Sequence, residues 1–223
     1  GLRSEESFLL KQFAQGQSRM RPWAALALGL HGYHALEEDV AHYDSTNVAL
    51  RRTLERTRSS ADANALCLAL GLRRDSEAVP ALLEHLESTR DDVQRGRVAM
   101  ALGLSGAREA IEPLQEIVRE SRYHPSLLRD AAVALALLGS RGMTSDLLAI
   151  LEESRSNAVR VGVVSAIGFV GDVRTVEPLL EILGDPQKST SLRTSAAQAL
   201  GIVCEDESLP WNAGFINRMN YTA

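Results

Sequence analysis

The sequence predicts an all-α protein, an α-solenoid of about six helical hairpins. The first observation is a motif of glycine and apolar residues that recurs along the chain and is clearest at residues 95–106, Arg-Gly-Arg-Val-Ala-Met-Ala-Leu-Gly-Leu-Ser-Gly. The second is the spacing of the copies, 42, 32, 36, 29 and 33 residues, a period in the range of stacked helical repeats. The third is composition: aromatics make up only 4% of the chain, and a core of alanine and leucine favours helices over strands.

One glycine anchors each copy of the motif. The two residues before the anchor are apolar in every copy. Four copies repeat a glycine three places after the anchor, which suits the positive φ that ends a helix, whereas Arg74 and Cys204 stand there in the other two. The six anchors are Gly29, Gly71, Gly103, Gly139, Gly168 and Gly201.

The N-terminal segment Ser4–Gln15 is expected to be a helix capped by Ser4. In the repeat frame it is the second helix of a unit whose first helix is missing, so we infer that the chain begins inside a longer solenoid. Residues 1–20 are therefore assigned to a preceding or capping repeat. Arg21–Leu28 is the first helix of repeat one, with Pro22 tolerated at a helix start.

Each repeat continues with a second helix marked by two leucine-rich columns. Because positions i and i+4 share one helical face, the two columns predict the buried side of that helix. The array of first and second helices extends over residues 21–204. The first column is Leu50, Leu82, Leu114, Leu147 and Leu179, and the second is Leu54, Leu86, Val118, Leu151 and Leu183.

The first repeat carries an insertion at about residues 30–45 that holds three of the five histidines. If this stretch is helical, His34, Glu38 and His42 follow one another at i to i+4 spacing and form one line. Two imidazoles and a carboxylate are reasonable ligands for zinc or iron, so the line is a speculative metal site. A solvated helix face is the simpler interpretation, because no fourth ligand or orienting partner can be identified.

The repeat pattern stops after Cys204, and residues 205–223 are expected to form a C-terminal capping tail. A terminal repeat exposes an apolar side that must be covered. Leu209, Trp211 and Phe215 are the candidates for this cover, with docking of the tail on another subunit as the alternative.

Bulk properties exclude some classes of partner. The net charge of −5 and the pI of about 5.6 argue against a general attraction to nucleic acid or anionic lipid. No apolar run approaches the roughly 20 residues of a membrane span. Cys67 and Cys204 form no metal-ligand pattern, so we expect two buried free thiols. The compartment is not determined, although the cytoplasm is favoured.

The sequence resembles the HEAT-repeat superfamily, most closely the short HEAT-like units first associated with phycobilisome lyases. The likeness is carried by Leu-Arg-Thr-Ser-Ala-Ala-Gln-Ala-Leu-Gly at 192–201 and Val-Glu-Pro-Leu-Leu-Glu-Ile-Leu at 176–183, and it covers roughly residues 20–204. The resemblance implies paired antiparallel helices stacked into a right-handed superhelix. It also implies that first helices lie on the convex side and that second helices line the concave side.

On that basis the exposed column of the second helices lines an acidic concave face. We expect this face to be a groove for a basic or polar segment of a protein or peptide partner, with solvated helix faces as the alternative. The candidate partner-binding residues are Arg52, Glu84, Glu112, Glu116, Glu177 and Glu181. A second column, Arg21, Arg95, Arg160 and Arg193, is expected to pair with acidic residues of adjoining repeats.

No catalytic residues and no cofactor are expected. The chain has no His-Glu dipeptide of the kind used by di-iron HEAT-like hydroxylases, and it has no GxxxxGK[ST] or GxGxxG loop. The predicted function is a non-catalytic scaffold for protein or peptide binding, with no nucleic-acid partner. The alternative is a small enzyme or cofactor-handling protein, either similar to bilin lyases or metal-dependent through the histidine-rich insertion.

Overall fold

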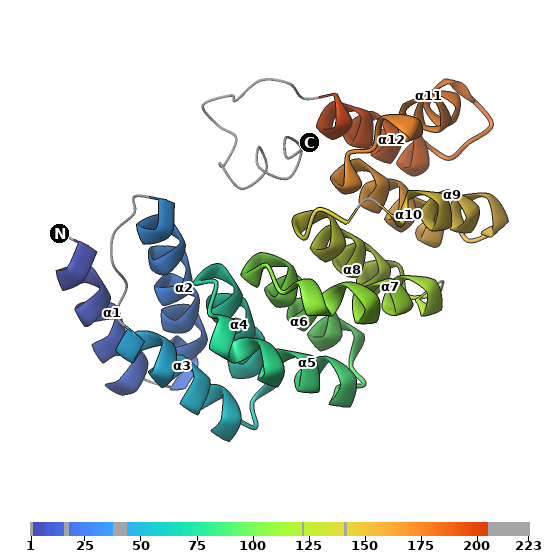
Figure 1. Cartoon of the computed structure of the whole chain (residues 1–223). Coiled ribbons are helices and arrows are strands. Elements are labelled where there is room, and N and C mark those ends of the chain that lie inside the picture. Colours follow the sequence, from blue (N-terminus) through green and yellow to red (C-terminus); the bar gives the residue numbers. More distant parts are fainter. Residues whose placement is uncertain (1, 16–17, 38–43, 122, 141, 205–223) are drawn as a thin grey trace. The chain divides into compact units, whose positions relative to one another are not determined.

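The computed structural model describes residues 2–15, 18–37, 44–121, 123–140 and 142–204, and its regular elements there are all helices (Figure 1). This confirms the all-α prediction. The α-helices are α1 (Leu2–Gln15), α2 (Arg21–Glu37), α3 (Asp44–Arg56), α4 (Ser60–Leu72), α5 (Val79–Ser88), α6 (Asp92–Ser105), α7 (Ile111–Glu120), α8 (Pro125–Leu137), α9 (Thr144–Glu153), α10 (Asn157–Val170), α11 (Val176–Gly184) and α12 (Thr190–Val203). Short 3₁₀ turns are η1 (Ser18–Met20), η2 (Ser76–Ala78), η3 (Arg108–Ala110) and η4 (Val173–Thr175).

The chain separates into two compact units, residues 1–107 and 108–223. In the first unit α1 packs on α2, α3 on α4 and α5 on α6; in the second, α7 packs on α8, α9 on α10 and α11 on α12. We call the helices that carry the leucine columns (α3, α5, α7, α9 and α11) leucine-marked, and those that carry a predicted anchor or end at one (α2, α4, α6, α8, α10 and α12) glycine-marked. Apart from the pair α1 and α2, each hairpin joins a leucine-marked helix to the glycine-marked helix that follows it. The sequence analysis paired each leucine-marked helix with the glycine-marked helix before it. Periodicity sets the spacing of helices but not which neighbour each one packs on. Consequently α1 is the partner of α2, not the second helix of an incomplete unit.

Four of the glycine-marked helices, α4, α6, α10 and α12, begin at polar caps, whereas α8 begins with Pro125 and has no side-chain cap. Ser59 Oγ accepts a hydrogen bond from the backbone N–H of Asp62 at 3.2 Å, which satisfies one of the free donors of the first turn of α4. Asp91, Ser156 and Ser189 cap α6, α10 and α12 in the same way. Local sequence therefore fixes where these helices start.

Two of these helices, α6 and α10, end in a left-handed glycine three places after the anchor, whereas Gly32 lies inside α2 without a positive φ and Cys204, at the end of α12, has φ of −95°. Gly106 has φ of 76° and Gly171 has φ of 65°, as the sequence predicts. Arg74 holds the equivalent place in α4 with φ of 50°, so the backbone keeps this geometry even where a side chain opposes it. In each case the next segment leaves the helix at the same point.

The fourth anchor is Ala136, and the assignment of Gly139 was wrong by three residues. α8 ends at Leu137, and Gly139 has φ of 71°. Its N–H bonds the carbonyl of Ala136 at 2.9 Å, as the N–H of Gly106 bonds that of Gly103 at 3.2 Å. Gly139 is therefore the residue that ends a helix, and the irregular spacings of 36 and 29 become 33 and 32.

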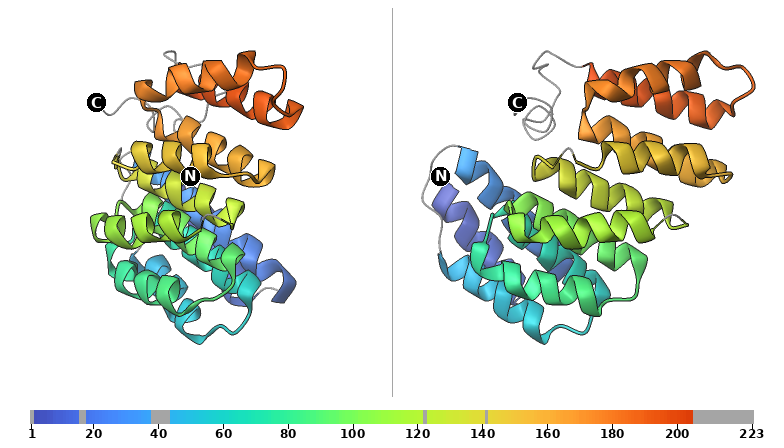
Figure 2. Two further views of the ribbon diagram at one scale, coloured as in Figure 1. Left: turned by 90° about the vertical axis from the view of Figure 1, so that its right-hand side faces the viewer. Right: turned by 45° about the vertical axis from the view of Figure 1, so that its right-hand side comes forward.

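The glycine-marked helices pack directly on one another, α2 on α4 on α6 in the first unit and α8 on α10 on α12 in the second (Figures 1 and 2). A Cβ placed on Gly71 would lie 2.5 Å from the carbonyl oxygen of Ala101. A Cβ on Gly168 would lie 2.8 Å from the Cα of Ala199. Each of these anchors meets the alanine two places before the next anchor, which explains why both positions are small.

The leucine-marked helices are more widely spaced than the glycine-marked helices. Within the first unit α3 and α5 make at most marginal contact, and the same holds for α9 and α11 in the second. When helices are closer together in one row than in the other, the stack curves so that the tightly spaced row is on the inside. The glycine-marked helices therefore form the inner side of each unit. The expectation that the leucine-marked helices are second helices lining the concave side was therefore wrong: they come first in their hairpins and lie on the outer side of each unit.

The leucine columns are buried as predicted. The first column, Leu50 through Leu179, is 0% exposed at all five positions, and of the second column only Leu183 is more than slightly exposed. These side chains fill the interior between the two helices of a hairpin. The leucine-marked helices thus present their opposite faces to solvent.

Arg73 ties four helices of the first unit together. Its Nη2 donates to Glu6 Oε1 of α1 at 2.8 Å, its Nη1 donates to the carbonyl of Leu28 in α2 at 3.1 Å, and its Nε donates to Asn47 of α3. Arg73 and Glu6 are both buried. Because a buried charge is costly unless it is paired, this ion pair fixes where α1 docks.

The histidine line and the capping tail fall partly or wholly outside the described residues. α2 continues past its predicted end at Leu28 and includes the first part of the insertion, through Glu37. Residues 38–43 and 205–223 are not described, so neither the histidine line nor the capping tail is tested.

Cys67 is free and buried as expected, and burial raises its pKa to about 12. Cys204 is free but exposed, contrary to expectation, because it lies at the C-terminal cap of α12.

The close approach of α4 and α6 predicts opposite effects for one substitution at two anchors. Gly71→Ala should lower the free energy of unfolding by about 1–3 kcal/mol, because its Cβ meets backbone atoms. Gly201→Ala should raise it by up to about 1 kcal/mol, because nothing lies within 4 Å of the new Cβ and alanine favours a helix. Urea unfolding followed by circular dichroism measures both, and equal effects would contradict this packing.

The left-handed residue at the end of α4 gives a second prediction. Arg74→Gly should raise the free energy of unfolding by about 0.5–1 kcal/mol, since relief of the positive-φ cost exceeds the added entropy of the unfolded chain. The reverse change, Gly106→Arg, should lower it by a similar amount at the equivalent position. Thermal denaturation of the two variants tests the pair.

Candidate functional site

All six predicted partner-binding residues are exposed on leucine-marked helices. Arg52 and Glu84 lie on α3 and α5 of the first unit; Glu112 and Glu116 lie on α7, and Glu177 and Glu181 on α11, in the second. Within the described part of the chain none of them makes an ion pair or a side-chain hydrogen bond. Their charges are therefore available to a partner, with two of the six residues in the first unit and four in the second.

Glu181 lines a cavity of about 250 Å³ between α9 and α11, which we name the α9–α11 groove. Its apolar lining comes from both helices, and its charged lining includes residues that the sequence did not single out as partner-binding. The lining residues are Leu148, Leu151, Glu152, Arg160, Pro178, Glu181, Ile182, Asp185 and Lys188. Of the predicted partner-binding residues, Glu181 is the one that lines this groove.

The charges of the groove divide into a paired and an unpaired set. Lys188 Nζ lies 3.5 Å from Asp185 Oδ2, so these two largely neutralise each other. Glu152 and Glu181 have no ion-pair partner among the described residues, and Arg160 Nε is buried without a hydrogen bond. The groove therefore combines an apolar lining with the Arg160 guanidinium and two free carboxylates, and these carboxylates can accommodate a long cationic side chain with an aliphatic stem.

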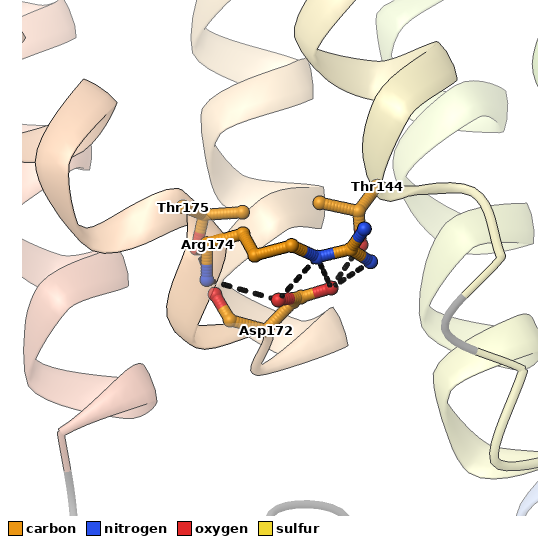
Figure 3. A network of polar contacts seen from close by, with 4 residues as sticks. All are labelled: Thr144, Asp172, Arg174 and Thr175. Atoms are coloured by element: carbon orange, nitrogen blue, oxygen red, sulfur yellow. Dashed lines mark hydrogen bonds and ion pairs between the residues drawn. The ribbon is translucent and has the colours of Figure 1, made fainter.

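A polar network at Asp172 connects the two helices that wall the groove (Figure 3). Thr144 Oγ1, at the start of α9, donates to Asp172 Oδ2 at 2.8 Å. The backbone N–H of Arg174 in η4 donates to Asp172 Oδ1 at 2.9 Å, and the Arg174 guanidinium donates to both carboxylate oxygens. Since η4 leads directly into α11, this network sets the position of α11 against α9.

Asp172 is ionised at all ordinary pH values. Hydrogen bonds from the Arg174 side chain hold the pKa of its carboxyl group well below its usual range. Burial opposes this effect, while the Arg174 backbone N–H and the Thr144 hydroxyl lower the pKa further. The network is therefore intact wherever the carboxylate is charged.

The first unit repeats this device at the same place in the motif. Asp75, like Asp172, stands four residues after its anchor, and its Oδ1 accepts the N–H of Glu77 at 3.1 Å. Arg51 of α3 donates to Asp75 at 2.6 Å and also contacts Glu77 at 2.6 Å. The sequence analysis singled out neither aspartate; the signal that could have found them is the aspartate that both copies carry four residues after the anchor.

The arginine column has a mixed outcome. Arg21 lies 3.6 Å from Asp62 of the adjoining hairpin, the kind of pairing that was predicted. Arg193 Nε donates instead to the carbonyl of Leu183 at 3.0 Å, at the end of α11 in its own hairpin. Arg95 Nε, like Arg160 Nε, is buried without a hydrogen-bond partner. Position in the motif thus does not fix the partner.

Among the described residues no group of three or more His, Cys, Asp and Glu side chains is arranged to hold a metal ion. His34 is exposed on α2, but Glu38 and His42 lie outside the described residues, so their line remains a prediction. The described helices include none that is both long and apolar enough to cross a membrane.

Comparison with known families matches this chain to HEAT repeats. A family model described as HEAT repeats matches residues 47–137 and 144–211, which include most of the repeat array and all of the α9–α11 groove. A search of curated proteins found no match. The narrower likeness to phycobilisome-lyase-type repeats stays a prediction.

The Asp172 network predicts a pH-dependent contribution to stability. Asp172→Asn keeps a capping oxygen but removes the charge, so it should lower the free energy of unfolding by about 1–2 kcal/mol at pH 7. Because the folded pKa is depressed, this contribution is complete above the unfolded pKa of about 4 and is lost as pH falls below it. Urea unfolding of wild type and variant should therefore converge at low pH.

The matched control is Glu177→Gln, which removes an exposed carboxylate with no described partner. It should leave stability nearly unchanged across the same range. A gap between wild type and Asp172→Asn that stays constant from pH 7 down to pH 3 would contradict the role assigned to the charge.

Proposed function

The chain belongs to the HEAT-repeat family, and from that premise we propose that it is a non-catalytic scaffold that binds a basic segment of a protein or peptide partner. Repeat proteins of this kind use most side chains to stack their units and leave one surface free for recognition. The helix caps, the anchor glycines and the leucine columns account for the packing residues. The exposed faces of the leucine-marked helices remain for binding.

The α9–α11 groove is the observation that carries this proposal. Its volume of about 250 Å³ suits one or two side chains of a partner better than a drug-sized ligand, whose pockets run from about 300 to 1,000 Å³. Leu148, Pro178 and Ile182 offer apolar contact to an aliphatic stem, and Glu152 and Glu181 offer charge to its tip. A lysine or arginine side chain of the partner matches both features.

The neighbouring helices extend the acidic surface within the second unit. Glu177 lies one turn from Glu181 on α11, and Glu112 and Glu116 are exposed on α7. α7 is tied to α9 by Arg119 Nε, which donates to Asp146 Oδ2 at 3.1 Å. A partner segment with several basic residues would meet carboxylates on more than one helix, and the net charge of −5 favours its approach.

A fluorescein-labelled peptide of alternating lysine and leucine provides the test. The double variant Glu152→Lys, Glu181→Lys should weaken its binding, measured by fluorescence anisotropy, at least about tenfold, because two attractive charges become repulsive. The matched control is Glu55→Lys with Glu109→Lys, which makes the same change in net charge at two exposed positions outside the groove and should weaken binding less. The two double variants should unfold at similar temperatures.

Two outcomes would contradict the proposal. An equal loss of binding in both double variants would indicate a general charge effect rather than the groove. Stoichiometric zinc or iron in the purified protein, lost on changing His34 and His42 to alanine, would favour the alternative of a metal-dependent enzyme.

A further inference from the structure

A second cavity, of about 640 Å³, lies between α10 and α12 on the inner side of the second unit. Phe169 and Ile202 supply its large apolar side chains, and Ser165, Ser195 and Gln198 supply its polar ones. Among the described residues no charged side chain lines it, in contrast to the α9–α11 groove. We name it the α10–α12 groove.

The hollow exists because small residues face each other across the two helices. α10 and α12 approach closely at Gly168 and Ala199, as the other glycine-marked helices do. Beyond that contact Gly201 contributes no side chain, and a Cβ placed there would meet nothing within 4 Å. The half-buried rings and chains of Phe169 and Ile202 are therefore left with one uncovered apolar side.

After an acidic stretch, Glu205-Asp-Glu, the sequence supplies a segment rich in large apolar residues. Ile202 lines the groove, and residues 205–223 begin three positions later, outside the described part of the structure. This segment contains Trp211, Phe215, Ile216, Met219 and Tyr221, which is a high density of large apolar side chains for a chain with 4% aromatics. Its apolar character matches the uncharged groove.

Length and tethering favour this occupant over a free ligand. Trp211 follows Ile202 by nine positions, and an extended chain spans about 3.3 Å per residue, so it reaches any point of the groove. A short tether gives an effective concentration on the order of millimolar. Under those conditions the burial of one or two aromatic side chains is enough to occupy the site.

We propose that the segment 205–223 folds back onto its own chain and seats Trp211 in the α10–α12 groove, between Phe169 and Ile202. The indole ring covers the uncovered apolar sides of both residues, and the ring of Phe169 is a favourable neighbour for it. This inference concerns a different surface from the α9–α11 groove and does not depend on it.

Tryptophan fluorescence tests the proposal in the full chain. The protein has two tryptophans, and Trp23 is 67% exposed on α2, so Trp23→Phe leaves Trp211 as the single reporter at little structural cost. If Trp211 is seated, its emission is blue-shifted and its iodide quenching constant is at least about threefold below that of the denatured chain, since a pocket covers most of its occupant. Full quenching in the native protein overturns the proposal.

Groove variants locate the shielding. In the Trp23→Phe background, Phe169→Ser removes one wall and Gln198→Arg places a bulky charge at an exposed edge of the groove. Both should raise the quenching constant about threefold, toward the denatured value, by removing the cover that the pocket provides. The matched control Leu180→Glu changes an apolar side chain that is 54% exposed on α11, outside the groove, and should leave quenching unchanged. Circular dichroism verifies that each variant is folded, and Gln198→Arg keeps the test valid if Phe169→Ser is not.

The remaining outcomes distinguish other occupants. Shielding that grows with protein concentration would assign the groove to a second copy of the chain and overturn the intramolecular proposal. Shielding that survives in both folded groove variants would place Trp211 elsewhere and overturn it as well. Shielding that is independent of concentration and lost in a folded groove variant supports it.

Discussion

The contact between an anchor glycine and the backbone of the next glycine-marked helix is the constraint on which this structure depends. At Gly71 there is no space for a Cβ beside Ala101, and at Gly168 there is none beside Ala199. This contact brings α2, α4 and α6 together in one unit, and α8, α10 and α12 in the other. Because the leucine-marked helices do not approach each other as closely, each unit has a tightly packed inner row and a more open outer row.

Polar side chains at the helix ends determine how the open row is arranged. Asp172 caps η4, the turn that leads into α11, and accepts a hydrogen bond from Thr144 at the start of α9. One carboxylate therefore both fixes the start of this turn and holds α11 against α9. Asp75 plays the same part with Arg51 in the first unit. The spacing of the outer helices, and hence the α9–α11 groove between them, follows from hydrogen bonds as well as from apolar packing.

The two faces of the second unit consequently differ in chemistry. The outer groove carries Glu152 and Glu181 without ion-pair partners among the described residues, and the inner groove is lined by uncharged side chains. A HEAT-repeat scaffold with these surfaces can recognise a basic segment on one side while an apolar segment occupies the other. Charge and apolar burial discriminate between ligands in different ways, so the two sites need not compete.

The sequence by itself determined the helical class, the repeat and the buried leucine columns, because apolar periodicity and capping are local properties of the chain. It also identified Glu181 as exposed, since that position lies opposite the buried face of its helix. It did not determine which neighbour each helix packs on, that Gly139 ends a helix rather than anchoring a contact, or that Arg73 at the end of α4 would pair with Glu6 of α1. Those features, together with the inner position of the glycine-marked row and the residues that share each groove, depend on the distances between helices. Only tertiary packing decides such distances, because a pattern along one helix records which face is buried but not what covers it.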